Sequence, residues 1–221
     1  VDGMDAAALL AAGEQAMGTE NYQQATTYFS AIKTRFPFEK EAKQALLDSM
    51  YVNIQDHNAA AALAAAETFI HLYPRHEHVD YAYYMKGLAN FGRDINFFER
   101  VFNIDVAARD LDHFKVAFRD FNTFVRKFPN SEYAPDARLR MAFIRNALAE
   151  HALQVATFYY DRKAYVAAVN RAQEVVLHYQ GAPQVVPALQ LLVKAYQALD
   201  MGPQAAQSQQ LLEQLQQKIK S

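Results

Sequence analysis

One short pattern recurs four times along the chain and constrains its fold more than any other feature. Each copy contains an alanine seven residues before an apolar residue, within a set spaced by three, four and three residues. Residues at these spacings lie on one face of an α-helix, so each copy predicts a helix with one buried side. The copies are Tyr22, Ala25, Phe29 and Ile32; Ala59, Ala62, Ala66 and Phe69; Phe114, Ala117, Phe121 and Phe124; and Tyr165, Ala168, Ala172 and Val175.

The ends of these stretches also recur. Pro37, Pro74 and Pro129 each follow an aromatic residue and close a stretch of helical spacing, as a proline just past a helix end does. The fourth copy ends at Tyr179-Gln180 instead. The sequence between these points is rich in strong helix formers, and no stretch alternates apolar and polar residues as a half-buried strand would. We therefore predict an all-α fold.

Small residues indicate that these helices come in pairs. Gly13 stands twelve residues before Ala25, and Gly87 has the corresponding place before the third copy. Small residues at such positions let two helices approach closely, and the pattern resembles the tetratricopeptide repeat of about 34 residues. Gly87 to Ala117 is 30 residues where the repeat expects 12, so 30 − 12 = 18 residues, roughly 94–112, are inserted in the third repeat.

The rest of the chain completes the series. After the turn signal Pro129-Asn130-Ser131 we predict one long helix over about residues 135–161. A degraded fifth pair follows over residues 185–219, with Gly202-Pro203 as its turn and Ala206 as its small residue. Gln210 and Glu213 stand where apolar residues are expected, which suits a terminal pair with a polar outer side.

The prediction is a right-handed α-solenoid of five tetratricopeptide helix pairs. Residues 5–129 form an N-terminal half with repeats 1–3 and the insertion at about 94–112. Residues 130–221 form a C-terminal half with repeats 4 and 5. The two halves are expected to be parts of one continuous solenoid.

Composition excludes several classes of protein. The 22 Lys+Arg and 24 Asp+Glu give a net charge of −2, so the chain lacks the basic footprint of a nucleic-acid binder. The absence of cysteine excludes disulfide scaffolds, thiolate zinc sites and cysteine nucleophiles. The longest apolar run, Ala6–Ala12, is far shorter than the roughly 18 residues of a membrane span.

No catalytic motif is convincing. Glycine-rich phosphate loops, metalloprotease helices, nucleophile elbows and calcium loops are all absent. His71, His76 and His78 can offer imidazoles to a metal, but exposed histidines in a proline turn are usually only solvated. In the insertion we interpret the mixed charges as a loop held by its own ion pairs rather than an acid–base group. These charges are Asp105, Arg109, Asp110, Asp112 and His113. We expect a protein that is not an enzyme and that needs no cofactor or metal.

Three tyrosines are candidates for a peptide groove. The first helix of each tetratricopeptide pair lines the concave face of the solenoid, and Tyr51, Tyr81 and Tyr84 fall on those helices. Exposed tyrosines on a rigid surface give a large contact area and a polar tip at low entropic cost. The alternative, packing against the next helix, is equally open for these three.

Five stretches of the chain, taken in order, carry a resemblance to a known family. The stretches are Arg35-Phe36-Pro37-Phe38, Tyr73-Pro74 with Asp80-Tyr81 and Tyr84 to Leu88, Phe102 to Asp105 with Arg109 to His113, Phe128 to Ser131, and Val155 to Tyr160 with Ala164 to Arg171. They resemble the BamD family, also called ComL, of lipoproteins in the machine that folds β-barrels into the bacterial outer membrane. The resemblance covers the chain from about residue 5 to the C-terminus, and the insertion falls in the matching repeat.

The resemblance implies a non-catalytic scaffold on the periplasmic face of the outer membrane, held by an acylated N-terminal cysteine. It implies that the C-terminal half docks on the POTRA region of BamA. It implies that the N-terminal repeats bind unfolded outer-membrane barrel proteins and, in some lineages, BamC; BamE is a further expected partner. Arg171 matches a family arginine that contacts an acidic residue of BamA, and a guanidinium suits such pairing. An ordinary solvated helix residue is an equal alternative for Arg171.

Two departures from the family pattern stand out. Glu39-Lys40-Glu41 replaces the usual Gly-Pro turn after Phe38, which favours an extended following helix. The anchoring cysteine is absent, so either the chain begins just after the lipidation site or this member is not lipidated. The alternative function is a general tetratricopeptide adaptor for other peptides in the cell envelope or cytoplasm.

Overall fold

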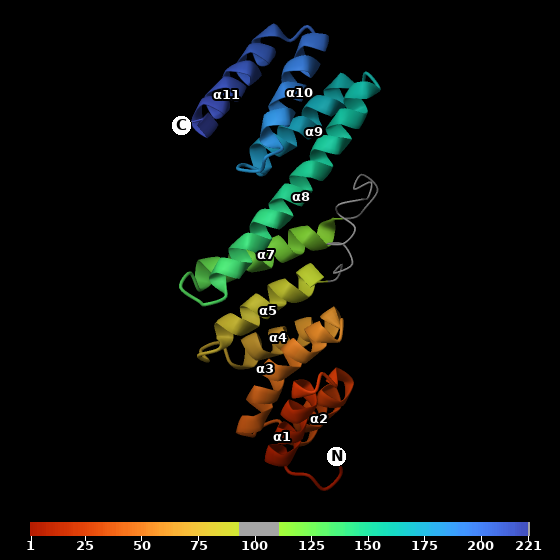
Figure 1. The fold of residues 1–221 in the computed structure, drawn as a ribbon, viewed down its shortest axis with the longest axis vertical. Coiled ribbons are helices and arrows are strands. Elements are labelled where there is room, and N and C mark those ends of the chain that lie inside the picture. The colour runs from red at the N-terminus through yellow and green to blue at the C-terminus, as the bar shows by residue number, and fades with distance from the viewer. Residues whose placement is uncertain (93–110, 221) are drawn as a thin grey trace. The chain divides into compact units, whose positions relative to one another are not determined.

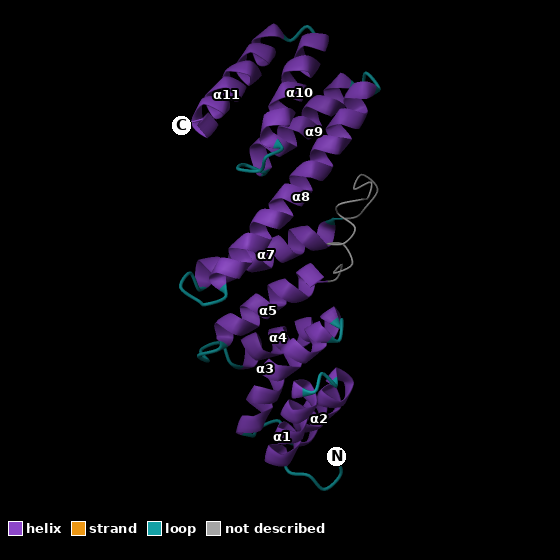
Figure 2. Ribbon diagram, in the orientation of Figure 1, coloured by secondary structure: helices purple, strands orange, loops and turns teal. Residues whose placement is uncertain are grey.

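The computed structural model describes residues 1–92 and 111–220, and all regular elements in these ranges are α-helices (Figures 1 and 2). The all-α prediction is confirmed for this part of the chain. The predicted insertion at 94–112 lies outside the described residues except for its last two positions. The helices are α1 (Ala6–Gly18), α2 (Tyr22–Arg35), α3 (Lys40–Gln55), α4 (Ala59–Leu72), α5 (Val79–Phe91), α7 (Asp112–Lys127), α8 (Ala134–Asp161), α9 (Tyr165–His178), α10 (Val185–Ala198) and α11 (Gly202–Lys220).

The helices gather in two compact units, and α8 contributes to both. In the first unit, which includes residues 1–92 and 112–139, each of the helices α1 to α5 packs on the next, and α5 packs on α7. In the second unit, which includes residues 140–220, α10 packs on both α9 and α11. Sequential neighbours thus pack as antiparallel pairs, because the turns between them are short.

The recurring pattern forms the core. Six of its seven alanines are fully buried: Ala25, Ala62, Ala66, Ala117, Ala168 and Ala172 each have 0% of their surface exposed, whereas Ala59, the first residue of α4, is only partly buried. The aromatic and aliphatic members Phe29, Phe69, Phe121 and Val175 are equally buried. The spacing therefore predicted the buried face of each helix correctly.

Two glycines lie against two of these buried phenylalanine rings. A methyl group added at Gly13 of α1 would lie 2.8 Å from Cδ1 of Phe29 on α2. One added at Gly87 of α5 would lie 2.6 Å from Cδ1 of Phe121 on α7. Both distances are well below a van der Waals contact, so each ring occupies the space that a side chain would need.

Four turns between helices share one backbone conformation. Glu20, His57, Lys163 and Asp200 each have φ between 56° and 62° and each stands two residues beyond a helix end. The amide of the next residue donates to a carbonyl five residues back, as in Asn58 N to Asn53 O at 2.8 Å. These bonds satisfy carbonyls that the helix ends leave open. None of the four residues is glycine, so no residue type in the sequence indicates this geometry.

The C-terminal pair corrects one prediction. Ala206, expected as the buried small residue, is exposed, and Ala205 is buried instead with Ser208 and Leu212. The reason lies in the turn: Asp200 makes the left-handed turn, and Gly202-Pro203 forms the first turn of α11 rather than a loop before it. Proline is accepted in a first helical turn, where its missing N–H needs no partner. The buried face is therefore shifted by one residue.

Replacing the contact glycines should destabilise the first unit. Gly87→Ala must displace the buried Phe121 ring, and overpacking of this kind costs about 1–3 kcal/mol. Urea unfolding followed by circular dichroism measures the loss as a lower midpoint. Gly18→Ala is the matched control, because Gly18 is helical and has no atom within 4 Å of the added methyl group. That change should be neutral or stabilising by up to about 1 kcal/mol. Equal effects of the two substitutions would contradict the role of the ring contact.

Candidate binding surfaces

The structure brings Tyr81 and Tyr84 of α5 together with a third tyrosine, Tyr133, from the turn before α8. The Tyr84 and Tyr133 rings are stacked, with centroids 5.0 Å apart and an interplanar angle of 17°. Tyr81 lies 5.4 Å from Tyr133 in a tilted arrangement. The Tyr84 hydroxyl lies 2.7 Å from Oδ2 of Asp136 in α8 and donates to it. Sequence analysis missed Tyr133, because it lies in a turn with no periodic pattern.

Packing on neighbouring helices holds this tyrosine cluster (Tyr81, Tyr84 and Tyr133). The Tyr84 ring also contacts Phe124 of α7, with centroids 5.8 Å apart. Ser131, in the turn before α8, donates to Oδ2 of Asp80 at the start of α5 over 2.6 Å. Burial raises the pKa of Tyr81, and the nearby Tyr133 and Asp48 raise it further. Each of these two rings, Tyr81 and Tyr84, packs against neighbouring residues and is only partly covered. Both the peptide-groove interpretation and the packing interpretation therefore have a structural basis.

Tyr51 of α3 is the most open of the three predicted groove tyrosines, with 40% of its surface exposed. Its neighbour Tyr22 begins α2, and the pKa of Tyr22 is raised by burial, then by the charge of Glu20 and by Tyr51. Tyr51 also acts electrostatically on Tyr81.

A partly buried carboxyl, that of Asp48, lies on α3 in the same unit as these tyrosines. Its Oδ1 accepts a hydrogen bond from Nε2 of Gln44 at 2.8 Å, while its Oδ2 is buried and has no hydrogen-bond partner among the described residues. Burial raises the pKa of Asp48 to about 6, the hydrogen bond from Gln44 lowers it, and the charge of Glu14 raises it. No pattern in the sequence marked this residue.

Arg171 lies on α9 in the second unit. Its Nη1 is 3.0 Å from Oε2 of Glu174, one turn along the same helix, and 52% of its side chain is exposed. A cavity of about 260 Å³ lies beside it, lined by Tyr159, Ala167, Asn170 and Arg171. The guanidinium of Arg171 is therefore about half exposed, and it lies beside this cavity.

The other sequence candidates have structural surroundings of their own. The His76 ring packs edge-on against Phe69 at 5.2 Å, and its Nδ1 accepts the amide of His78 at 3.2 Å. Residues 1–92 and 111–220 contain no group of three or more histidines or carboxylates that can hold a metal ion. Asp105, Arg109 and Asp110 lie outside the described residues. Asp112 forms an ion pair with Lys115, whose Nζ lies 2.8 Å from Oδ1 of Asp112.

In the same described ranges, no helix has the length and apolar character needed to cross a membrane.

A family model described as "Outer membrane lipoprotein" and named YfiO matches residues 2–211, nearly the whole chain. The chain belongs to the YfiO family.

Several relatives of this YfiO-family chain carry the name "Outer membrane protein assembly factor BamD". The protein from Neisseria meningitidis serogroup A is 37% identical over 205 residues, which are 93% of this chain and 77% of the relative. The protein from Pasteurella multocida is 36% identical over 201 residues, with 91% and 77% covered. The protein from Vibrio cholerae is 35% identical over 205 residues, with 93% and 85% covered. These relatives confirm the resemblance to the BamD family that the five stretches indicated.

Asp48 should make the stability of this YfiO-family protein depend on pH. Its folded-state pKa of about 6 is above the ordinary 3.8, so the folded state holds this proton to higher pH than the unfolded chain. The free energy of unfolding should therefore rise as pH falls from 7 through 6 and level off below about 4. After allowance for partial solvent screening, the gain is about 1–2 kcal/mol.

Urea midpoints between pH 4 and 8 measure this effect. Asp48→Asn keeps an acceptor for Gln44 and removes the buried charge, so it should be more stable than the native chain at pH 8 and lose the rise. Asp56→Asn, at an exposed position just past the end of α3, controls for the loss of one negative charge. Parallel pH profiles of the native chain and Asp48→Asn would show that Asp48 is not the titrating group.

Proposed function

We propose that this chain is a non-catalytic scaffold subunit of the outer-membrane β-barrel assembly (BAM) complex. In this role it binds the POTRA region of BamA and unfolded outer-membrane proteins, and promotes their assembly and insertion. The observation that carries the proposal is the family match over residues 2–211, with relatives that are named outer membrane protein assembly factors. The proposed location is the periplasmic face of the outer membrane, through a lipid anchor on a cysteine preceding these residues.

The proposed architecture is five tetratricopeptide repeats with an insertion in the third. The four left-handed turns support this count, because they recur at equivalent places: Glu20 and His57 are 37 residues apart, as are Lys163 and Asp200. Each of these turns joins the two helices of a pair. The third pair is α5 and α7, which the predicted insertion at about 94–112 separates in the sequence.

The N-terminal half, residues 5–129, is the proposed substrate surface. Tyr51 is the exposed contact, while Tyr81 and Tyr84 form its packed wall together with Tyr133. Aromatic rings held by neighbouring helices lose little conformational entropy on binding. An extended substrate strand with an aromatic end is the proposed ligand.

The C-terminal half, residues 130–221, is the proposed docking surface for BamA. Arg171 offers a half-exposed guanidinium beside a cavity of about 260 Å³, and its planar fork suits bidentate pairing with a carboxylate. A carboxylate of BamA would compete with Glu174 for this group. Other BAM lipoproteins, such as BamC and BamE, complete the proposed set of partners. No nucleic acid, metal or cofactor has a place in this function.

The alternative is a general tetratricopeptide adaptor with unrelated peptide ligands. The open tyrosine surface suits both functions. Binding to a POTRA domain distinguishes them, since an unrelated adaptor has no reason to bind one.

Removing the exposed tyrosine should weaken substrate binding. Tyr51→Ala should lower the affinity for a peptide from the aromatic C-terminal strand of an outer-membrane barrel by about 5- to 30-fold, in the range of an interface hot spot. Fluorescence anisotropy with the labelled peptide measures the change. Tyr51→Phe keeps the ring and should lose much less peptide affinity, and POTRA binding should be unaffected.

Tyr81→Ala and Tyr84→Ala should weaken peptide binding too, together with a loss of stability from lost packing. Unchanged peptide affinity in all three alanine variants would contradict the groove.

Removing the guanidinium should weaken docking on BamA. Arg171→Gln should reduce the affinity for a BamA POTRA fragment by at least about tenfold, because the partner carboxylate is left unpaired. Arg171→Lys should recover only part of it, and surface plasmon resonance can rank the variants. Glu174→Gln is the matched control: it breaks the same internal ion pair but keeps Arg171, so it should bind as well as the native chain or better. If Glu174→Gln weakens docking as much as Arg171→Gln does, the ion pair has only a structural role.

A further inference from the structure

An aromatic ring and a cation are stacked on the surface of the second unit, where α8 ends. Phe158 is 50% exposed, and Cζ of Arg162 lies 4.2 Å from the centre of its ring. Such a cation–π contact uses the flat face of the guanidinium, so the N–H donors at its edge stay available. The ring therefore holds the guanidinium in place without satisfying its hydrogen-bonding capacity.

The Arg162 guanidinium also lacks a carboxylate partner within the described residues. No Asp or Glu in residues 1–92 or 111–220 forms an ion pair with it, whereas Arg171 pairs with Glu174. A guanidinium forms its strongest hydrogen bonds with a carboxylate. Arg162 thus offers a place for a carboxylate of another molecule.

Aromatic contact connects this pair to the cavity beside Arg171. The Phe158 ring packs edge-on against Tyr159, with centroids 5.7 Å apart. Tyr159 lines the cavity of about 260 Å³ together with Asn170 and Arg171. Val166, 64% exposed, stands four residues before Asn170 and so lies on the same face of α9. A strip of aromatic and apolar side chains therefore leads from Arg162 to Arg171.

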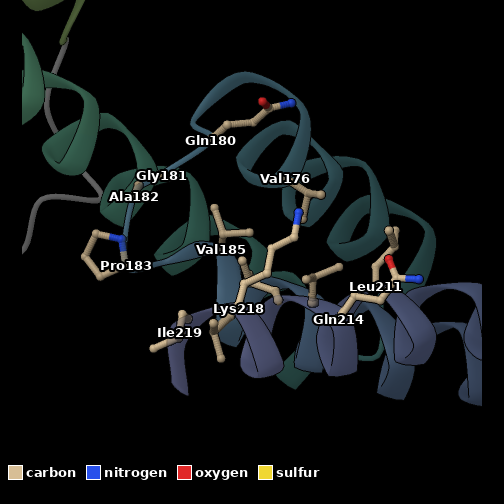
Figure 3. Close-up of a pocket in the computed structure, with 13 residues that line it drawn as sticks. Val176, Gln180, Gly181, Ala182, Pro183, Val185, Leu211, Gln214, Lys218 and Ile219 are labelled. Carbon is tan, nitrogen blue, oxygen red and sulfur yellow. The ribbon is translucent and has the colours of Figure 1, made fainter. Parts of the chain in front are cut away.

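This strip is separate from the apolar groove between α9, α10 and α11 (Figure 3). None of the residues that line the groove belongs to the strip. The two surfaces also differ in composition, because the strip combines aromatic rings with two guanidiniums. Aromatic residues and arginine are the residue types that most often carry the binding energy of protein interfaces.

We propose that Phe158 and Arg162 extend the docking surface of Arg171, and that the partner segment bound there carries two carboxylates and an apolar side chain. One carboxylate pairs with Arg171 and the other with Arg162, while the apolar side chain packs on the Phe158 ring. Two cations with an exposed ring between them are complementary to such an acidic segment. This inference rests on the proposed function, since it deepens the surface proposed for BamA.

Surface plasmon resonance with the full chain and a BamA POTRA fragment tests the extended surface. Phe158→Ala should lower the affinity at least about fivefold, as a residue central to an interface does. Arg162→Gln should lower it about two- to fivefold, as expected for one solvent-exposed ion pair, mainly through slower association. Affinity should also fall less steeply with added salt in Arg162→Gln than in the native chain, because one screened ion pair is missing.

Two matched variants control for changes elsewhere in the second unit. Lys194→Gln, at an exposed position of α10 outside the strip, removes one positive charge. Leu211→Gln, in the lining of the groove in Figure 3, removes an apolar side chain that is 45% exposed. Both variants should bind the POTRA fragment as the native chain does. Losses equal to those of Arg162→Gln and Phe158→Ala would overturn the assignment.

The outcomes also distinguish this inference from the proposed function. If Arg171→Gln weakens docking but Phe158→Ala and Arg162→Gln do not, the extension is wrong and the proposed function stands. If the native chain does not bind the POTRA fragment, both are wrong. A weaker Arg162→Gln variant with an unchanged salt dependence would assign Arg162 a structural role and overturn its pairing with a carboxylate.

Discussion

The contact between an aromatic ring and a glycine on the facing helix sets the geometry of the first unit. Phe29 and Phe121 are completely buried, and each ring covers a glycine that has no room for a side chain. Because the ring fills the place of a missing methyl group, the two helices of each pair come close together and their relative register is fixed. The alanines of the recurring pattern extend the same principle, since small residues on one face allow the next helix to approach.

This close packing through small residues explains how much of the fold could be predicted from the sequence. A buried face that repeats with helical spacing leaves a periodic trace, so the four copies, the long helix α8 and the buried alanines were predicted correctly. The buried face of α11 was misplaced by one residue, because Gly202-Pro203 reads as a turn but forms the first turn of the helix. Turn signals indicate that a boundary is near but do not fix which residue starts the helix.

The candidate binding surfaces were only partly predictable, for a different physical reason. Tyr51, Tyr81, Tyr84 and Arg171 stand on helices and could be named from periodicity and resemblance. Tyr133 and Asp48 acquire their significance from neighbours on other helices, and tertiary contacts leave no local pattern. The two units also differ in chemistry. The first combines stacked tyrosines with a partly buried carboxyl, whereas the second presents an exposed guanidinium beside a small cavity.

The four left-handed turns have a consequence for how such a chain can diversify. Glutamate and lysine are disfavoured at positive φ, and aspartate and histidine are accepted there less readily than glycine, so the helices on either side and the backbone bonds at the helix end impose the conformation. The identity of the turn residue is therefore only weakly restricted. The number of residues in the turn is more restricted, because an added residue would disrupt the bond to the carbonyl five residues back. One residue inserted within the following helix would rotate its buried face by about 100° and move its alanines away from their neighbours. Within these pairs, point substitutions at the turn are the tolerated form of change, and changes of length are confined to connections outside them.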